Sequence, residues 1–196
     1  ILAEIARIIE PKKITINDLI ILVWVFCFIS STKNNTLILI DNLYLFIMGK
    51  IEKTDHFYLI DGSGYIFRAY YALPPLTRKS DGLPTGAVSG FCSMLFKLLE
   101  DSKSKQNKQK PTHFAVIFDS ARKTFRNEIY SEYKANRSEA PDDLAPQFEY
   151  IRKSVLAFNL PSVDLTNYEA DDLIATYVDQ ILKKGAKVTI VSSDKD

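Results

Sequence analysis

Three short apolar runs in this chain each end on aspartate. The first leads to Asp61, the second to Asp119, and the third to the pair Asp194 and Asp196. Uninterrupted apolar runs of this length are typical of strands that are buried on both faces of a parallel sheet. The carboxyl ends of such strands meet at one edge of the sheet, where the functional crevice lies. The sequence therefore predicts that these four acids share one site.

A second set of acids lies between the second and third runs. Glu169, Asp171 and Asp172 open a segment of strong helical periodicity. Residues 169 and 172 share a helical face, so we expect them to point at the strand ends, while Asp171 points about 100° away. Taken singly, each acid has a simpler explanation, because aspartates cap turns after strands and acids are favoured in the first turn of a helix.

Seven carboxylates in one place need a counter-charge. Two such charges about 4 Å apart repel each other by roughly 4 kcal/mol at an effective dielectric near 20. Protons, basic side chains or divalent cations could offset this repulsion. Oxygen ligands favour Mg²⁺ or Mn²⁺ over zinc, and the only histidines, His56 and His113, flank strands. We expect two Mg²⁺ or Mn²⁺ ions, the usual arrangement for phosphodiester hydrolysis.

A basic and aromatic segment follows the second strand. Between residues 120 and 140 there are five arginines and lysines against three glutamates. Arg126, Lys134 and Arg137 could neutralise phosphates, while Phe125, Tyr130 and Tyr133 could stack on unpaired bases. A solvated amphipathic segment with ordinary ion pairs is the alternative.

The order of elements predicts the fold class. The expected order is strand, helix from Thr85 or Gly86, strand, the long segment 120–142, helix from about Leu144 to Phe158, short strand 162–165, helix and strand. Thr166 and Glu169 have the spacing of a capping box, and Gly185 is a plausible helix stop. This is a doubly wound α/β order.

The first 47 residues differ from the rest. Their apolar runs, 19–29 and 37–47, are shorter than the roughly 20 residues that span a bilayer. The first methionine is Met48, so we expect residues 1–47 to be an upstream extension and residues 48–196 to be the domain. Cys27 and Cys92 are isolated, which is typical of a protein of the reducing cytoplasm.

From Phe57 to Asp196 the chain resembles the amino-terminal part of the 5'-nuclease domain of bacterial DNA polymerase I, in the flap endonuclease superfamily. The resembling stretches are Asp61-Gly62-Ser63 with Arg68-Ala69-Tyr70, Pro84-Thr85-Gly86-Ala87, Phe118-Asp119, Thr124-Phe125-Arg126, Tyr133-Lys134 with Arg137, Pro141-Asp142-Asp143-Leu144, Tyr168 through Asp172, and Ser193-Asp194-Lys195-Asp196. The resemblance implies a PIN-like α/β fold, a mostly parallel sheet flanked by helices. It also implies a helical arch at about residues 122–140, through which a 5' single strand passes.

The resemblance also implies roles for individual residues. The two divalent metals would be bound by Asp61, Asp119, Glu169, Asp171, Asp172, Asp194 and Asp196. Arg126, Lys134 and Arg137 would contact the scissile phosphate region. The remaining DNA contacts would come from Arg68, Arg122, Lys123, Phe125 and Tyr133.

The implied substrates are DNA with a 5' flap or nick and RNA primers paired with DNA. The implied protein is a monomer without a membrane partner that is joined to polymerase domains. The chain departs from the family in stopping at Asp196, before its last metal ligands and duplex-binding region, and in carrying Ser138-Glu139-Ala140 where Pro-Pro-Met is usual. We therefore expect a carboxyl-terminally truncated domain.

Two other functions stay open at this point. A noncatalytic module that binds branched DNA would need the phosphate contacts but not a complete metal site. A receiver-like phosphoacceptor domain would also cluster acids around Mg²⁺ at strand ends, although it would not need the basic segment or the acids of residues 169–172.

Overall fold

Apolar strands alternate with amphipathic helices along the chain, and this order builds a parallel sheet. The computed structural model describes residues 51–104 and 110–193, which belong to one compact unit, Ile51–Asp196. The described strands are β1 (His56–Asp61), β2 (His113–Ile117), β3 (Ser162–Val163) and β4 (Lys187–Val191). They lie in the order β3-β2-β1-β4, and every pair is parallel. The ends of β1 and β2 therefore meet at one edge, as predicted.

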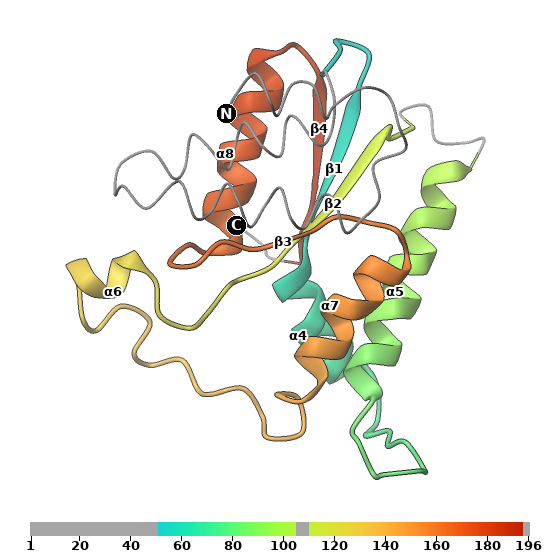
Figure 1. Cartoon of the computed structure of the whole chain (residues 1–196), viewed down its shortest axis with the longest axis vertical. Coiled ribbons are helices and arrows are strands. Elements are labelled where there is room, and N and C mark those ends of the chain that lie inside the picture. Colours follow the sequence, from blue (N-terminus) through green and yellow to red (C-terminus); the bar gives the residue numbers. More distant parts are fainter. Residues whose placement is uncertain (1–50, 105–109, 194–196) are drawn as a thin grey trace, which may run out of the picture. The chain divides into compact units, whose positions relative to one another are not determined.

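Helices lie on both faces of the sheet (Figure 1). The described helices are α4 (Gly62–Ala72), α5 (Gly86–Lys103), α6 (Phe125–Ile129), α7 (Gln147–Ala157) and α8 (Ala170–Lys183). Helices α4, α5 and α7 lie against one another on one side of the sheet, and α8 lies on the other. This arrangement confirms the predicted α/β class with a parallel sheet flanked by helices.

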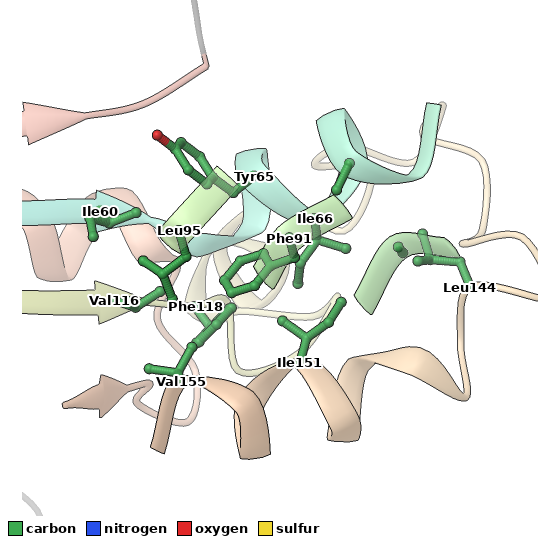
Figure 2. Close-up of a cluster of buried hydrophobic side chains, with 12 residues drawn as sticks. Ile60, Tyr65, Ile66, Phe91, Leu95, Val116, Phe118, Leu144, Ile151 and Val155 are labelled. Atoms are coloured by element: carbon green, nitrogen blue, oxygen red, sulfur yellow. The ribbon is translucent and has the colours of Figure 1, made fainter. Parts of the chain in front are cut away.

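The main core fills the space between the sheet and helices α4, α5 and α7 (Figure 2). Ile60 and Val116 point into it from β1 and β2, and Phe91 and Leu95 come from α5; all four are fully buried. Complete burial of side chains of this size stabilises the fold by about 1.5–3 kcal/mol each. This core fixes the strand ends, because the strands cannot slide without exposing these side chains.

Helix α4 was not predicted from the sequence. Gly62 and Gly64 after Asp61 are typical of a turn, but residues 62–72 form a helix that is capped by Asp61. Its buried face is formed by Tyr65, Ile66 and Ala69, which recur at helical spacing.

The start of α8 corrects another prediction. Thr166 is not its N-cap; the cap is Glu169, which forms a capping box with Asp172. The carboxylate of Glu169 accepts a backbone N–H as a threonine hydroxyl would. Gly185, with φ of 81°, follows the helix as expected.

The helical arch is largely not helical in this structure. Within residues 122–140 only α6 is a helix, and a run of turns at residues 131–136 follows it. Figure 1 shows this segment as a long loop between β2 and α7.

Several predictions fall outside the described residues. These are the apolar runs 19–29 and 37–47, and both Asp194 and Asp196. Across residues 51–104 and 110–193, no helix is long and apolar enough to cross a membrane.

Candidate active site

Asp61 ends β1 at the edge where the strand ends meet. Its carboxylate Oδ1 accepts a hydrogen bond from the Gly64 backbone N–H at 3.0 Å, and its Oδ2 accepts one from Ser192 Oγ at 2.9 Å. Only 8% of the residue is exposed. A Cβ on Gly64 would lie 2.6 Å from Asp61 Oδ2, so glycine at this position leaves room for the carboxylate.

Asp119 lies two residues beyond β2 and is held from several directions. Its backbone N–H donates to Ser63 Oγ at 3.0 Å, and its backbone carbonyl accepts from Arg152 Nη2 at 2.8 Å. Its carboxylate Oδ1 accepts from the Ala170 backbone N–H, the first amide of α8, at 2.8 Å. The predicted convergence of strand-end acids with the start of α8 is thus seen directly at Asp119.

Asp171 lies within electrostatic reach of the strand-end acids. Crowding by protein atoms raises the pKa of its carboxyl, and the charges of Asp61, Asp119 and Glu169 raise it further, while Lys134 lowers it. These three neighbours therefore lie near enough for their charges to act on Asp171. The arrangement differs from the expected one, in which residues 169 and 172 point at the strand ends and Asp171 points away.

Asp172 is instead paired with Arg126 of α6. Arg126 Nη1 and Nη2 donate to the two carboxylate oxygens at 2.7 and 2.6 Å. This fork of hydrogen bonds lowers the pKa of Asp172, against the opposing effect of burial. The guanidinium also lies 4.7 Å from the ring centroid of Phe125 and 5.8 Å from that of Tyr133.

Glu169 has basic and aromatic partners from the same segment. Lys134 Nζ donates to Oε1 at 2.8 Å and Tyr133 Oη donates to Oε2 at 3.3 Å. Burial lowers the pKa of Lys134, but the hydrogen bonds to Glu169 and Tyr133 outweigh it, so the pKa is raised. Lys134 also has φ of 55°, in the left-handed region that a lysine rarely adopts.

A cavity of about 430 Å³ joins the acids to the basic segment. Its lining includes Asp119 and Glu169 together with Arg122, Lys123, Tyr133, Lys134 and Arg137. Arg122 donates to the Arg137 carbonyl and, at 3.2 Å, to Glu139 Oε1. These two hydrogen bonds connect residues that line the cavity. All five basic and aromatic residues were candidates from the sequence, and the structure brings them to one wall.

A second cavity, of about 460 Å³, is lined by Asp61, Gly64 and Ser193. Arg68, a predicted DNA-binding residue, lines it with Phe67 and Tyr71 of the same helix. Sequence reasoning missed these two aromatics because α4 itself was missed. Their spacing of four residues on a helix would have placed them on one face.

Carboxylate oxygens are the type of ligand that a hard divalent cation prefers, but the described side chains are not arranged around a single cation position. Among residues 51–104 and 110–193, no three His, Cys, Asp or Glu side chains are grouped closely enough to hold a metal ion. Glu169 and Asp172 bind basic side chains instead. Asp61, Asp119 and Asp171 offer only oxygen donors, which Mg²⁺ and Mn²⁺ prefer, and the charges of Asp61 and Asp119 disfavour a charged Asp171.

The sequence model of a family described as "5'-3' exonuclease, N-terminal resolvase-like domain" matches residues 56–196. The chain belongs to this family. The described part of the exonuclease domain includes both β1 and β2, whose ends carry Asp61 and Asp119.

Named relatives support the assignment to the 5'-3' exonuclease family. The chain is 59% identical to DNA polymerase I of Rhizobium leguminosarum over 150 residues, which are 76% of this chain and 15% of that protein. It is 42% identical to the 5'-3' exonuclease of Aquifex aeolicus over 139 residues, which are 71% of this chain and 45% of that protein. The chain thus spans less than half the length of these relatives.

Solved structures show the same fold. A bacteriophage T5 flap endonuclease in a pseudo-enzyme-product complex with DNA and metal ions has a TM-score of 0.50 and 22% identity, covering 71% of this chain and 49% of that one. A T5 5'-exonuclease with bound zinc has a TM-score of 0.50 and 23% identity, with the same coverage. At this level of identity the likeness shows that the exonuclease domain shares its α/β fold with these proteins.

Proposed function

We propose that the chain carries the catalytic end of a divalent-metal-dependent 5'-3' exonuclease or flap endonuclease, which hydrolyses phosphodiesters of DNA or of RNA primers. One observation supports this most: Asp119 and Glu169 line one cavity together with Arg122, Lys123, Lys134 and Arg137. The charges of Asp61 and Asp119 also act on the nearby Asp171. Acids that can bind metal and basic residues that can bind phosphate in the lining of one cavity suit a polyanionic substrate.

The proposed metal ligands come from both sets of acids. They are Asp61, Asp119, Glu169, Asp171 and Asp172, with Asp194 and Asp196 from beyond the described residues. Two bound Mg²⁺ or Mn²⁺ ions would supply activation of the attacking water and stabilisation of the leaving oxygen. Asp61 and Asp119 are already oriented by backbone and side-chain hydrogen bonds, so their oxygens need little rearrangement.

The basic residues are proposed to bind phosphate. Arg126, Lys134 and Arg137 would contact the scissile phosphate, and Arg68, Arg122 and Lys123 would contact the DNA backbone. Arg126 and Lys134 then have two alternative partners, the carboxylates seen here and a phosphate of the substrate. Tyr133 lines the cavity and can stack on a base, whereas the Phe125 ring packs 5.4 Å from that of Tyr168 and must turn to do so.

The biological setting follows from the relatives. DNA polymerase I homologues support a place in primer removal and repair in the cytoplasm, with polymerase domains in the same protein. The T5 flap endonuclease was solved with DNA, and we propose DNA with a 5' flap or nick as the substrate of this chain, acting as a monomer.

Cleavage of a 5'-labelled flap by this chain is the direct test. We expect release of the 5' product in Mg²⁺ or Mn²⁺ and none in EDTA. Release that is unaffected by EDTA, or no release in either metal, would contradict the proposed chemistry.

A noncatalytic module that binds branched DNA is the second candidate. It is favoured by the absence of a three-ligand group among the described residues and by the pairing of Glu169 and Asp172 with basic side chains. Flap binding that is equally tight with and without Mg²⁺, without cleavage, would support this candidate.

A further inference from the structure

Asp119 lies beyond the end of its strand, so the sheet does not fix its orientation. The last ladder residue of β2 is Ile117, and the Phe118 N–H still donates to the Val163 carbonyl at 2.8 Å. One residue later, Asp119 is exposed and depends on hydrogen bonds from other elements. Its carboxylate direction is therefore set by the few groups that contact it.

Arg152, in the middle of α7, makes three contacts at this point. Its Nη2 donates to the Asp119 carbonyl and its Nη1 donates to Asp164 Oδ1, both at 2.8 Å. Its guanidinium carbon lies 4.8 Å from the ring centroid of Phe118. A planar guanidinium has separate donors for both hydrogen bonds and a face for the ring, so all three contacts can be satisfied together.

These contacts hold the peptide group that follows Asp119. With the carbonyl bound by Arg152 and the N–H bound by Ser63 Oγ, the backbone on both sides of the Asp119 side chain is fixed. The carboxylate is then directed so that Oδ1 caps the Ala170 N–H. Among the residues that the structure describes, none hydrogen-bonds to Oδ2 of this carboxylate.

We infer that Arg152 is a positioning residue that orients the Asp119 carboxylate through its backbone, an inference that rests on the metal-binding role proposed for Asp119. An ordinary surface ion pair would account for the contact with Asp164, which is 42% exposed, but such a pair contributes little. It does not account for the hydrogen bond to the Asp119 carbonyl or for the contact with the buried Phe118 ring. Those two contacts connect α7 to the site.

The Ala170 amide provides a readout that needs neither metal nor substrate. Ala170 follows the N-cap Glu169 and so has no acceptor within its own helix, which leaves Asp119 Oδ1 as its recorded partner. We expect Arg152→Gln to speed hydrogen exchange of the Ala170 amide by about tenfold, with core amides of β1 unchanged. Arg152→Lys, which keeps one donor, should restore part of the protection. Lys153→Gln, on the next residue of α7, is the matched control and should match the parent protein.

Mn²⁺ titration of the same variants distinguishes a positioning role of Arg152 from a simple decrease in the amount of folded protein. We expect Arg152→Gln to raise the Kd for Mn²⁺ by about tenfold at unchanged stoichiometry, because groups behind a metal ligand commonly have effects of this size. A purely structural role would lower the stoichiometry and leave the Kd unchanged.

Asp164→Asn is a second variant, which keeps both contacts of Arg152 with the site. It should raise the Ala170 exchange rate and the Kd for Mn²⁺ by less than Arg152→Gln does. The inference would be overturned if Ala170 exchange and the Kd of Arg152→Gln equalled those of Lys153→Gln. Faster Ala170 exchange without Mn²⁺ binding by any variant, the parent included, would support the orienting role and contradict the proposed metal chemistry.

Discussion

Arg126 and Asp172 form a two-pronged ion pair between α6 and the first turn of α8. The hydrogen bonds are 2.7 and 2.6 Å long, and the side chains are 30% and 21% exposed. This pair joins the basic segment, which is mostly irregular, to α8, whose N-cap and first turn carry three of the candidate acids. It also positions Arg126 3.8 Å from Glu169 Oε2.

Replacing Arg126 should therefore destabilise the fold. Arg126→Gln leaves the partly buried Asp172 carboxylate without its charged partner, and we expect the free energy of unfolding to fall by about 2 kcal/mol. Urea unfolding of the two proteins measures this difference. Lys153→Gln is the control, because Lys153 and Glu149 are 64% and 72% exposed and such a surface pair contributes little to stability. Equal losses in the two variants would contradict this account of Arg126.

Two substitutions at Asp119 should separate its structural role from its proposed catalytic one. Asp119→Asn keeps an oxygen that can accept the Ala170 N–H, whereas Asp119→Ala removes it. We expect Ala to lower the free energy of unfolding by about 1 kcal/mol and Asn to leave it nearly unchanged. Both variants should lose flap cleavage and keep flap binding. Full cleavage by the Asn variant would show that the charge of Asp119 is not needed.

The edge of the sheet could be predicted because its signals are local. Apolar runs that end on Asp61 and Asp119 identify parallel strands, and the rule that such strand ends meet placed both acids together. Helix α4 could not be predicted in the same way, since Gly62 and Gly64 favour a turn. Only the cap supplied by Asp61 and the buried face of α4 make that segment helical.

The partners of the acids could not be predicted from the sequence. Periodicity placed Glu169 and Asp172 on one face, but it could not show that Arg126 and Lys134, some 35 to 46 residues away, would pair with them. The helix also begins at Ala170, so Glu169 is its extended N-cap and lies outside the helical spacing on which the shared face was predicted. Arg152 carries no sequence signal at all, because its role depends on where α7 packs.

Asp81 should titrate at unusually low pH. Hydrogen bonds from Arg78, helped by the Leu83 N–H, lower the pKa of this carboxyl from 3.8 to about 2. Because the folded-state pKa is the lower one, the carboxylate stabilises the fold above pH 3.8, and this contribution is lost as the pH falls through about 2. Carbon NMR of the Asp81 carboxyl measures the pKa directly. Arg78→Gln should return it toward 3.8, whereas Lys79→Gln should leave it low.

Lys134 combines a strained backbone with a charge at the site. Its φ of 55° is rare for lysine, and its Nζ is held 2.8 Å from Glu169 Oε1 beside the cavity. Lys134 keeps this rare backbone conformation with its charge at the site. We therefore expect its substitution to lower the cleavage rate more than the affinity for DNA.

We expect Lys134→Ala to slow single-turnover cleavage of a saturating flap substrate by about 100-fold, as for loss of one group that stabilises developing charge. Flap affinity should change by less than about tenfold, because several other basic side chains are proposed to contact the DNA backbone. Lys134→Arg should recover much of the rate. Lys184→Ala, at the opposite end of α8, is the control and should cleave like the parent protein. If Lys134→Ala cleaved as fast as that control at saturation, Lys134 would be a structural partner of Glu169 alone.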